Sequence, residues 1–268
     1  MTNPKIAFIG GGNMAEGIVR GMIGDDRFNA RQVHVYDINP QRVEYLQKEY
    51  GIIGEVSMQN AVKNADIVIF AVRPQEAHTV GVQLKDFMPK NCIFVSICAS
   101  VSIATLEQML GRSSKIVRIM PNTLTQAHYG YSSLCRNANT TAEEAKTVIE
   151  IMEAIGRVME IPEDMFDAFT AYSCAGPAYL LYIMRSMIDA GVHAGFSRQQ
   201  ARSITIENMI GTAIKLNQTD MHPYEILDTM TSPGGVGIEA IYTMEQEGIG
   251  GSIMRSFQEA ARRVKELS

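Results

Sequence analysis

Small residues with a characteristic spacing follow the first apolar run of the chain. The run Lys5–Ile9 leads into the segment Gly10–Ala15, which reads Gly-Gly-Gly-Asn-Met-Ala. This G-x-G-x-x-A pattern between a strand and a helix is the fingerprint of a dinucleotide-binding turn. Its first glycine permits a tight turn, its second lets the backbone approach a pyrophosphate, and the N–H groups of the helix face the anion. The expected cofactor contacts are Ile9, Gly10, Gly11, Gly12, Asn13 and Met14.

An acidic residue stands where such a turn needs one. Asp37 follows the second apolar run, Val33–Tyr36, and its carboxylate could accept hydrogen bonds from the ribose hydroxyls of the cofactor. A carboxylate there repels a 2′-phosphate, so the sequence favours NADH and leaves NADPH open. Arg42 could hold a 2′-phosphate, but we expect it to be a solvated helix residue. The alternative, a glycine turn in an α/β domain that binds no dinucleotide, is disfavoured because strand, helix and acid agree.

Short apolar runs alternate with amphipathic segments over residues 1–162. Such runs predict mostly parallel strands covered on both faces by crossover helices, which is a doubly wound α/β Rossmann domain. One crossover helix has Asn39 as its N-cap and Gly51 beyond its end, and another has Thr141 and Glu144 as a capping box. The predicted strands are Ile6–Ile9, Val33–Tyr36, Ile67–Val72, Cys92–Ile97 and Ile116–Met120, with edge strands at Tyr129–Leu134 and Arg157–Ile161.

The pattern changes after Pro162, where helical periodicity broken by glycine and proline replaces the strand pattern. We therefore expect two domains, a dinucleotide-binding domain over residues 1–162 and an all-α domain over residues 163–268. An apolar stripe from Leu181 to Ile188 could face either an internal core or a partner chain. The predicted helices are Asp164–Ala194, Arg198–Asn217, Pro223–Met230, Gly237–Glu247 and Ser252–Leu267.

Composition excludes several classes of partner. A net charge of −5 over 268 residues leaves no basic surplus to neutralise phosphates, so no nucleic-acid partner is expected. No apolar run approaches membrane-spanning length, and the first residues lack the pattern of a secretion signal, so we expect a cytoplasmic protein with no membrane partner. The four cysteines lack metal-ligand spacing, so we expect reduced, structural thiols and no bound metal.

Further motifs extend over the whole chain. They are Ala71-Val-Arg-Pro-Gln75, Arg118-Ile-Met-Pro-Asn-Thr123, Gly176-Pro-Ala-Tyr179, Asp189-Ala-Gly191 and Thr231-Ser-Pro-Gly-Gly235. In this order and spacing, and together with the N-terminal fingerprint, they resemble pyrroline-5-carboxylate reductases. The Met-Pro-Asn-Thr and Ser-Pro-Gly-Gly segments are much more specific to that family than the glycine fingerprint.

The resemblance implies a reaction and an assembly. The reaction is hydride transfer from NADPH or NADH to the imine carbon of Δ1-pyrroline-5-carboxylate, which gives L-proline in the last step of proline biosynthesis. A cyclic imine is basic enough to react as its iminium, so no strong general acid is needed, and the five histidines carry no obvious catalytic motif. The assembly is at least a homodimer formed by the helical domain, with active sites completed at the interface.

The resemblance also implies site residues. In the family, backbone N–H groups of the Ser-Pro-Gly-Gly turn hold the substrate carboxylate where the turn opens a helix. No catalytic side chain is certain, and the backbone of Val236 and Gly237 is expected near the imine. Glu163 matches an acidic position near the substrate, although it could equally favour a helix N-terminus. The implied substrate-binding residues are Glu163, Ser232, Pro233, Gly234, Gly235, Val236 and Gly237. The further cofactor-binding residues are Ala71, Val72, Arg73, Pro74, Cys98 and Ala99.

Departures from the family pattern gather in the substrate half. Val236 and Gly237 stand where the family usually has threonine, and the other replacements are Cys174, Ala175, Leu124 and Ser100. Three functions therefore stay open: the proline-forming reductase, a reductase for a different carboxylated imine or carbonyl, and a non-catalytic regulatory protein that binds a dinucleotide. A β-hydroxyacid dehydrogenase ranks below these, because Ser173–Ala190 contains no lysine to serve as its catalytic residue.

Overall fold

The computed structural model describes residues 4–99, 101–127 and 129–267. Of the positions considered above, Ser100, His128 and the first three residues lie outside this description. The chain forms two compact units, which are described separately. The first contains residues 1–174 with 264–268, and the second contains residues 175–263.

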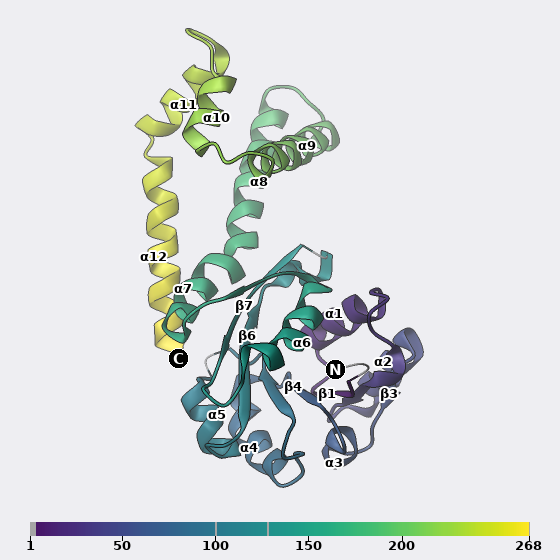
Figure 1. The fold of residues 1–268 in the computed structure, drawn as a ribbon. Helices are drawn as coiled ribbons and strands as arrows, with labels where there is room; N and C mark the ends of the chain where they lie inside the picture. Colours follow the sequence, from purple (N-terminus) through teal and green to yellow (C-terminus); the bar gives the residue numbers. More distant parts are fainter. Residues whose placement is uncertain (1–3, 100, 128, 268) are drawn as a thin grey trace. The chain divides into compact units, whose positions relative to one another are not determined.

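The first unit is built on an eight-stranded sheet with the order β3-β2-β1-β4-β5-β6-β7-β8 (Figure 1). Neighbouring strands pair in parallel, except that β6 and β7 are antiparallel. The strands are Ile6–Ile9 (β1), Val33–Tyr36 (β2), Ile53–Gly54 (β3), Ile67–Phe70 (β4), Ile93–Ser96 (β5), Lys115–Pro121 (β6), Gly130–Arg136 (β7) and Gly156–Glu160 (β8). The predicted Rossmann-type sheet is confirmed, with the short β3 as an addition that the sequence analysis lacks.

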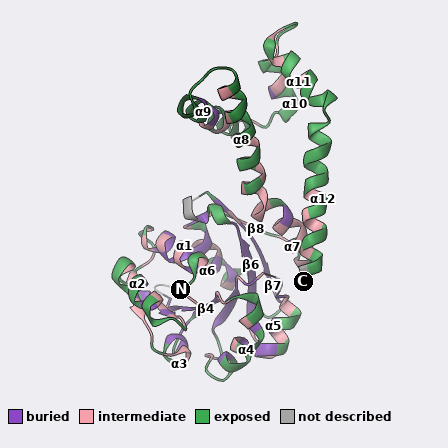
Figure 2. Cartoon of the chain, turned by 180° about the vertical axis from the view of Figure 1, so that it is seen from behind, coloured by how far each residue is buried: buried purple, intermediate pink, exposed green. Residues whose placement is uncertain are grey.

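Helices cover both faces of this sheet. Alternate residues of each strand point to opposite faces, so Phe8 packs with α1, α2 and α6 while its neighbour Ile9 packs with α3, α4 and α5. The central strands β1, β4 and β5 are buried on both faces, which is why they read as continuous apolar runs (Figure 2). The helices are Asn13–Ile23 (α1), Pro40–Tyr50 (α2), Met58–Val62 (α3), Pro74–Lys85 (α4), Ile103–Leu110 (α5) and Ala142–Glu153 (α6).

The second unit is helical, as predicted. Few of its residues are buried, and α8 and α11 have none (Figure 2). Leu181 in the predicted apolar stripe is 66% exposed. Exposure on this scale favours the partner-facing alternative for the stripe. None of the helices in the described part of the chain has the length and apolarity to cross a membrane. The helices are Gly176–His193 (α8), Arg198–Asn217 (α9), Pro223–Met230 (α10), Val236–Gln246 (α11) and Ile249–Leu267 (α12), the last of which runs beyond this unit.

The predicted single helix Asp164–Ala194 is wrong. The chain instead makes a 3-10 turn Glu163–Met165 (η3), a one-turn helix Phe166–Phe169 (α7) and a π-helical turn Thr170–Cys174 (η4) before α8 begins. Phe166 is fully buried with Met120 of β6 and Cys135 of β7, so packing against these two strands fixes this segment. The first unit consequently continues to Cys174, beyond the boundary predicted after residue 162.

Candidate functional site

The carboxyl ends of four neighbouring strands lie in one row. Ile9 of β1 is in register with Tyr36 of β2 and Phe70 of β4, and Phe70 is in register with Ser96 of β5. The chain leaves β1 towards β2 on one side and returns to β4 on the other, which makes this edge a topological switch point, where α/β sheets bind ligands. The segments that follow these strands contain the predicted cofactor residues from Gly10, Asp37, Ala71 and Cys98 onward.

The two fingerprint glycines, Gly10 and Gly12, differ in why a glycine stands at each position. Gly10 has a φ of +101°, and a Cβ there would lie 2.5 Å from the carbonyl oxygen of Ala71, so only glycine fits. Gly12 has an ordinary φ of −64°, and no heavy atom lies within 4 Å of the position that its Cβ would take. The fold therefore tolerates a side chain at Gly12, and the space beside it is open to a ligand.

The first turn of α1 presents unpaired donors beside that space. Gly12 is the N-cap residue and makes no side-chain cap hydrogen bond, while Glu16 donates its N–H to the Gly12 carbonyl at 2.9 Å. The N–H groups of Asn13 and Met14 precede this first intrahelical bond. Open backbone, free N–H groups and the positive end of the helix dipole together fit a pyrophosphate.

Asp37 holds the glycine turn in place. Its carboxylate accepts a hydrogen bond from the Gly11 N–H at 2.7 Å and one from the Asn39 N–H at 2.8 Å. Each carboxylate oxygen keeps further lone-pair capacity. The side chain can therefore orient the turn and still accept ribose hydroxyls.

Arg42 is not the solvated helix residue that the sequence suggests, and this expectation is wrong. Its Nε donates to the Gly11 carbonyl at 2.5 Å, its terminal nitrogen pairs with Glu16, and its guanidinium lies over the Tyr45 ring. Its side chain is only 22% exposed. The spacing along the sequence gives no sign of this, because the partners are on α1 and the loop before it.

The loop after β4 touches the glycine turn. Ala71 donates its N–H to the Ile9 carbonyl at 2.9 Å, and its carbonyl faces Gly10. Val72 is half-buried behind it, whereas Arg73 is exposed and pairs with Glu76. Pro74 then opens α4 at its first position. The structure thus brings Ala71 and the glycine turn together, while the Arg73 guanidinium pairs with Glu76 on the following helix.

The loop after β5 offers backbone and a small side chain. The thiol of Cys98 is buried and donates to the Val72 carbonyl at 3.2 Å. Burial raises the pKa of Cys98 to about 11, so the thiol stays neutral at neutral pH. Ala99 is half-buried beside it. The Cys98 side chain therefore packs inward as a structural group, and a bound cofactor would meet the backbone here.

Asn122 is a positioning residue whose role the sequence alone does not indicate. It is 5% exposed; its amide donates to the Ser173 carbonyl at 3.4 Å and to the Ser173 Oγ at 3.2 Å, and its oxygen accepts from the Leu124 and Tyr131 N–H groups. Ser173 lies in the π-helical turn, and such turns are frequent at functional sites. The Met-Pro-Asn-Thr motif, which contains Asn122, was the available signal.

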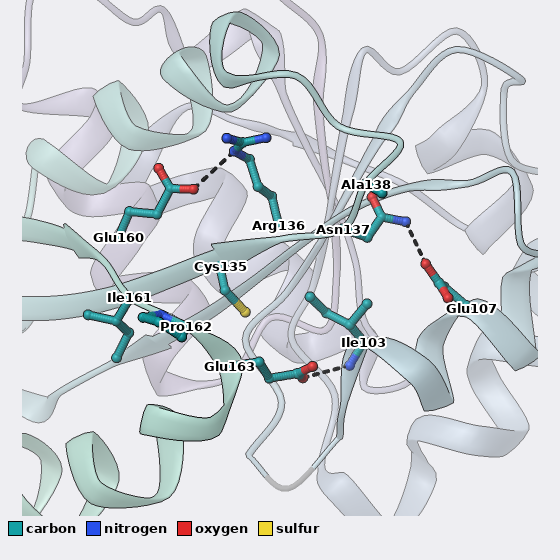
Figure 3. A pocket seen from close by; sticks show the side chains of 10 residues that line it. All are labelled: Ile103, Glu107, Cys135, Arg136, Asn137, Ala138, Glu160, Ile161, Pro162 and Glu163. Atoms are coloured by element: carbon teal, nitrogen blue, oxygen red, sulfur yellow. Dashed lines mark hydrogen bonds and ion pairs between the residues drawn. The ribbon is translucent and has the colours of Figure 1, made fainter.

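Glu163 is held by contacts within the first unit. Its carboxylate accepts from the Ile103 N–H and from Arg118, each at 2.8 Å, at the rim of a cleft of about 590 Å³ (Figure 3). Arg118 is only 6% exposed and stacks over the Phe166 ring at 4.6 Å. The carboxylate thus caps α5 and neutralises a buried cation, which favours the helix-terminus alternative over the substrate contact.

The Ser-Pro-Gly-Gly turn opens α11 in the second unit. Gly234 has a φ of +67°, Gly235 donates its N–H to the Ser232 carbonyl at 3.0 Å, and a Cβ on Gly235 would meet the Ser232 Oγ at 2.3 Å. Gly235 is the N-cap residue and makes no side-chain cap hydrogen bond. Val236, the first helical residue, is 92% exposed. The free N–H groups of Val236 and Gly237 can therefore meet a carboxylate from solution.

Two of the histidines that the structure describes interact with neighbouring side chains, and the other two lie on helices. The Nδ1 of His34 lies 2.7 Å from Glu55, and His222 caps α10 and stacks on Tyr224. His78 lies within α4 and His193 ends α8. Among the residues that the structure describes, no group of three potential ligands could hold a metal ion. The glycine turn and the Asp37 carboxylate at this sheet edge fit a dinucleotide cofactor.

The class of protein follows from this geometry and from sequence profiles. A dinucleotide-type sheet with an open pyrophosphate position and a helical second unit defines an NAD(P)-dependent oxidoreductase of the Rossmann type. The profile described as "NADP oxidoreductase coenzyme F420-dependent" matches residues 5–100, and that described as "Pyrroline-5-carboxylate reductase dimerisation" matches residues 163–267.

Similar proteins then narrow the class to one family. The pyrroline-5-carboxylate reductase of Methanosarcina acetivorans is 34% identical over 100% of this chain and 99% of its own length. That of Escherichia coli is 32% identical over 98% of both. The solved structure of the enzyme from Coxiella burnetii has a TM-score of 0.94 at 29% identity, covering 99% of each chain. The solved structure of the Plasmodium falciparum pyrroline carboxylate reductase with NADP bound has a TM-score of 0.88 at 28% identity, covering 99% of this chain and 98% of its own. The chain belongs to the pyrroline-5-carboxylate reductase family.

Proposed function

We propose that this protein reduces Δ1-pyrroline-5-carboxylate to L-proline with NADPH or NADH. The observation that carries the proposal is the open space beside Gly12 at the N-terminus of α1, in a chain that belongs to this family over its full length. The reduced nicotinamide supplies the hydride, and the imine nitrogen takes up one proton from solvent. Because a cyclic imine reacts as its iminium, the chain needs to bind and orient rather than donate a proton.

The first unit would hold the cofactor. The N–H groups of Gly12, Asn13 and Met14 would meet the pyrophosphate, and Asp37 would accept the ribose hydroxyls. Ile9, Gly10 and Gly11 form the turn itself. The loops at Ala71–Pro74 and Cys98–Ala99 would contact the cofactor mainly through their backbone. The Cys98 thiol already donates to the Val72 carbonyl, and the Arg73 guanidinium pairs with Glu76.

The second unit would hold the substrate carboxylate. Ser232–Gly235 would wrap it, and the N–H groups of Val236 and Gly237 would donate to it at the positive end of the α11 dipole. With neither residue carrying a hydroxyl, the backbone supplies the polar contacts near the imine. Glu163 would act through Arg118 and α5, and a direct substrate contact is the weaker alternative for it.

The assembly we propose is a homodimer formed by the helical unit. The match of residues 163–267 to a dimerisation profile and the many exposed apolar residues of α8 support it. We also propose a cytoplasmic location, with which four free thiols agree.

The test is oxidation of NADH and NADPH by the purified protein, followed by nicotinamide absorbance, with and without pyrroline-5-carboxylate. Oxidation that depends on the imine, with proline as product, is the expected result. Cofactor binding without imine-dependent oxidation would overturn the proposal. It would instead favour a reductase for a different carboxylated imine, in line with the apolar Val236, or a silent site.

A further inference from the structure

The guanidinium of Arg42 lies at the glycine turn, but it already makes a hydrogen bond to Gly11 and an ion pair with Glu16. The Gly11 residue is held from both sides, its N–H by Asp37 at 2.7 Å and its carbonyl by the Arg42 Nε at 2.5 Å. The carboxylate expected at the ribose and the guanidinium of Arg42 therefore converge on one residue. Arg42 is the third residue of α2, whose N-cap Asn39 also donates its N–H to Asp37.

Glu16 of α1 is the ion-pair partner of the Arg42 guanidinium. Its carboxylate pairs with Arg42 and also accepts the hydroxyls of Tyr50 at 2.8 Å and Tyr45 at 3.1 Å. Burial alone would raise the pKa of Glu16, but the hydrogen bonds from Arg42, Tyr50 and Tyr45 outweigh it and lower that pKa. Glu16 is therefore ionised at neutral pH and neutralises Arg42.

The surroundings add negative charge. A cleft of about 300 Å³ next to Asp37 is lined in part by Glu44 and Glu55. A 2′-phosphate carries close to two negative charges, so it needs an uncommitted cation to offset these carboxylates. A ribose with a free 2′-hydroxyl needs only an acceptor, which Asp37 provides.

We propose that Glu16 sets a preference for NADH over NADPH by holding Arg42 away from the 2′-phosphate position. Arg42 is the latent phosphate ligand, and Glu16 decides whether it is available. The inference rests on the proposed function only in taking the sheet edge as the cofactor site. It adds two specificity-determining residues, Glu16 and Arg42, both of which lie outside the Gly10–Ala15 fingerprint.

The experiment measures dissociation constants of NADH and NADPH by nicotinamide fluorescence, without imine, for the wild type and three variants. The wild type should bind NADH more tightly. Glu16→Gln keeps a hydrogen-bond acceptor but removes the charge, so the ratio of NADPH to NADH affinity should rise about tenfold, or about 1.4 kcal/mol. Glu16→Gln/Arg42→Met should return the ratio to the wild-type value. Arg42→Met alone should weaken both cofactors equally, since it only loosens the turn.

A matched control removes a glutamate charge from α2, the helix that carries Arg42, while Glu16 on α1 stays intact. Glu49→Gln lies on the exposed face of α2 and should leave the ratio within twofold of the wild type. A Glu16→Gln ratio that does not change, or a gain that survives in the double variant, overturns the inference while leaving the cofactor site intact. Absence of binding of either dinucleotide by the wild type overturns the cofactor assignment itself, so the two failures are distinguishable.

Discussion

Gly12 separates binding from folding at the scale of one residue. Because its backbone is ordinary and no atom stands within 4 Å of a Cβ, Gly12→Val should leave the melting temperature within about 2 °C of the wild type. The valine would occupy the space that we assign to the pyrophosphate, so NADH affinity should fall at least hundredfold. Titration of nicotinamide fluorescence measures the loss.

The matched control for that variant is Gly10→Val. With a φ of +101° and a Cβ contact of 2.5 Å to the Ala71 carbonyl oxygen, this change should lower the stability as well as the affinity. If Gly12→Val binds NADH as tightly as the wild type, the pyrophosphate lies elsewhere.

Glu163 is either a structural residue that pairs with Arg118 and caps α5 or a substrate ligand, and these two interpretations predict different effects of a substitution. Glu163→Ala leaves the cation of Arg118 buried without its carboxylate and removes a cap from α5. Because Glu163 itself is partly exposed, the loss should be about 2–3 kcal/mol in the free energy of unfolding, below the range for fully buried pairs. Urea denaturation measures it. Unchanged stability with a tenfold rise in the KM for the imine would instead identify Glu163 as a substrate ligand.

Single residues also mark the limit of prediction from sequence. The fingerprint and Asp37 could be recognised because strand, turn and helix are consecutive in the chain. The contact of Arg42 with Glu16 could not, since it joins two helices and depends on how closely they pack. The same holds for the inward direction of the Cys98 thiol, which follows from tertiary burial and not from local spacing.

The strands of the sheet follow from the sequence more closely than the segment at residues 163–174. Short apolar runs bounded by turns predicted β1 and β2 to the residue, and β4 and β5 to within two residues at each end. Two-residue β3 is too short for such a pattern. Helical periodicity also failed at residues 163–174, because burial of Phe166 against β6 and β7, and not the local pattern, imposes the break.

The N-terminus of α11 provides a prediction at the element scale. A Cβ on Gly237 would come no closer than 3.4 Å to the Met230 carbonyl oxygen and the Thr231 Cγ2, so Gly237→Thr fits the helix. A hydroxyl that hydrogen-bonds the iminium is worth about 1.5–3 kcal/mol, so kcat/KM for pyrroline-5-carboxylate should rise about tenfold or more. Steady-state kinetics measure it, with Gly237→Val as the control of similar size. No gain over that control would mean that the pocket suits a different substrate.

Helix α6 carries a pH-dependent contribution to stability. Glu144 completes the capping box with Thr141 and pairs with Lys115, and the hydrogen bond from Lys115, followed by those from Thr141, lowers its pKa from 4.5 to about 2. Since the folded pKa is depressed, the stabilisation is complete above pH 4.5 and is lost as the pH falls to about 2.

The corresponding variant is Glu144→Gln. Its melting temperature should lie below that of the wild type at pH 6, and the difference should shrink steadily between pH 4.5 and pH 2. Thermal unfolding followed by circular dichroism measures the melting temperatures of both proteins over this pH range. A difference that stays constant over this range would show that the charge of Glu144 contributes nothing.

The whole molecule raises the question of what stabilises the second unit. Its helices α8 and α11 bury no residue, and an apolar cleft of about 740 Å³ is lined by Tyr182, Met187 and Ile253 among others. A helical unit so poor in buried side chains gains most of its stability from a partner surface. We therefore expect dimerisation and folding of this unit to be coupled.

Charges placed in that cleft test the coupling. Tyr182→Glu/Met187→Glu would bury two unpaired carboxylates in a dimer, so the dissociation constant should rise at least hundredfold, and the helical unit should melt at a lower temperature. Sedimentation velocity at micromolar concentration measures the association. Val82→Glu makes the same kind of change on the exposed side of α4 in the first unit and should leave the dimer intact. A wild type that sediments as a monomer, or a double variant that stays dimeric, would place the partner surface elsewhere and leave the exposure of α8 without an explanation.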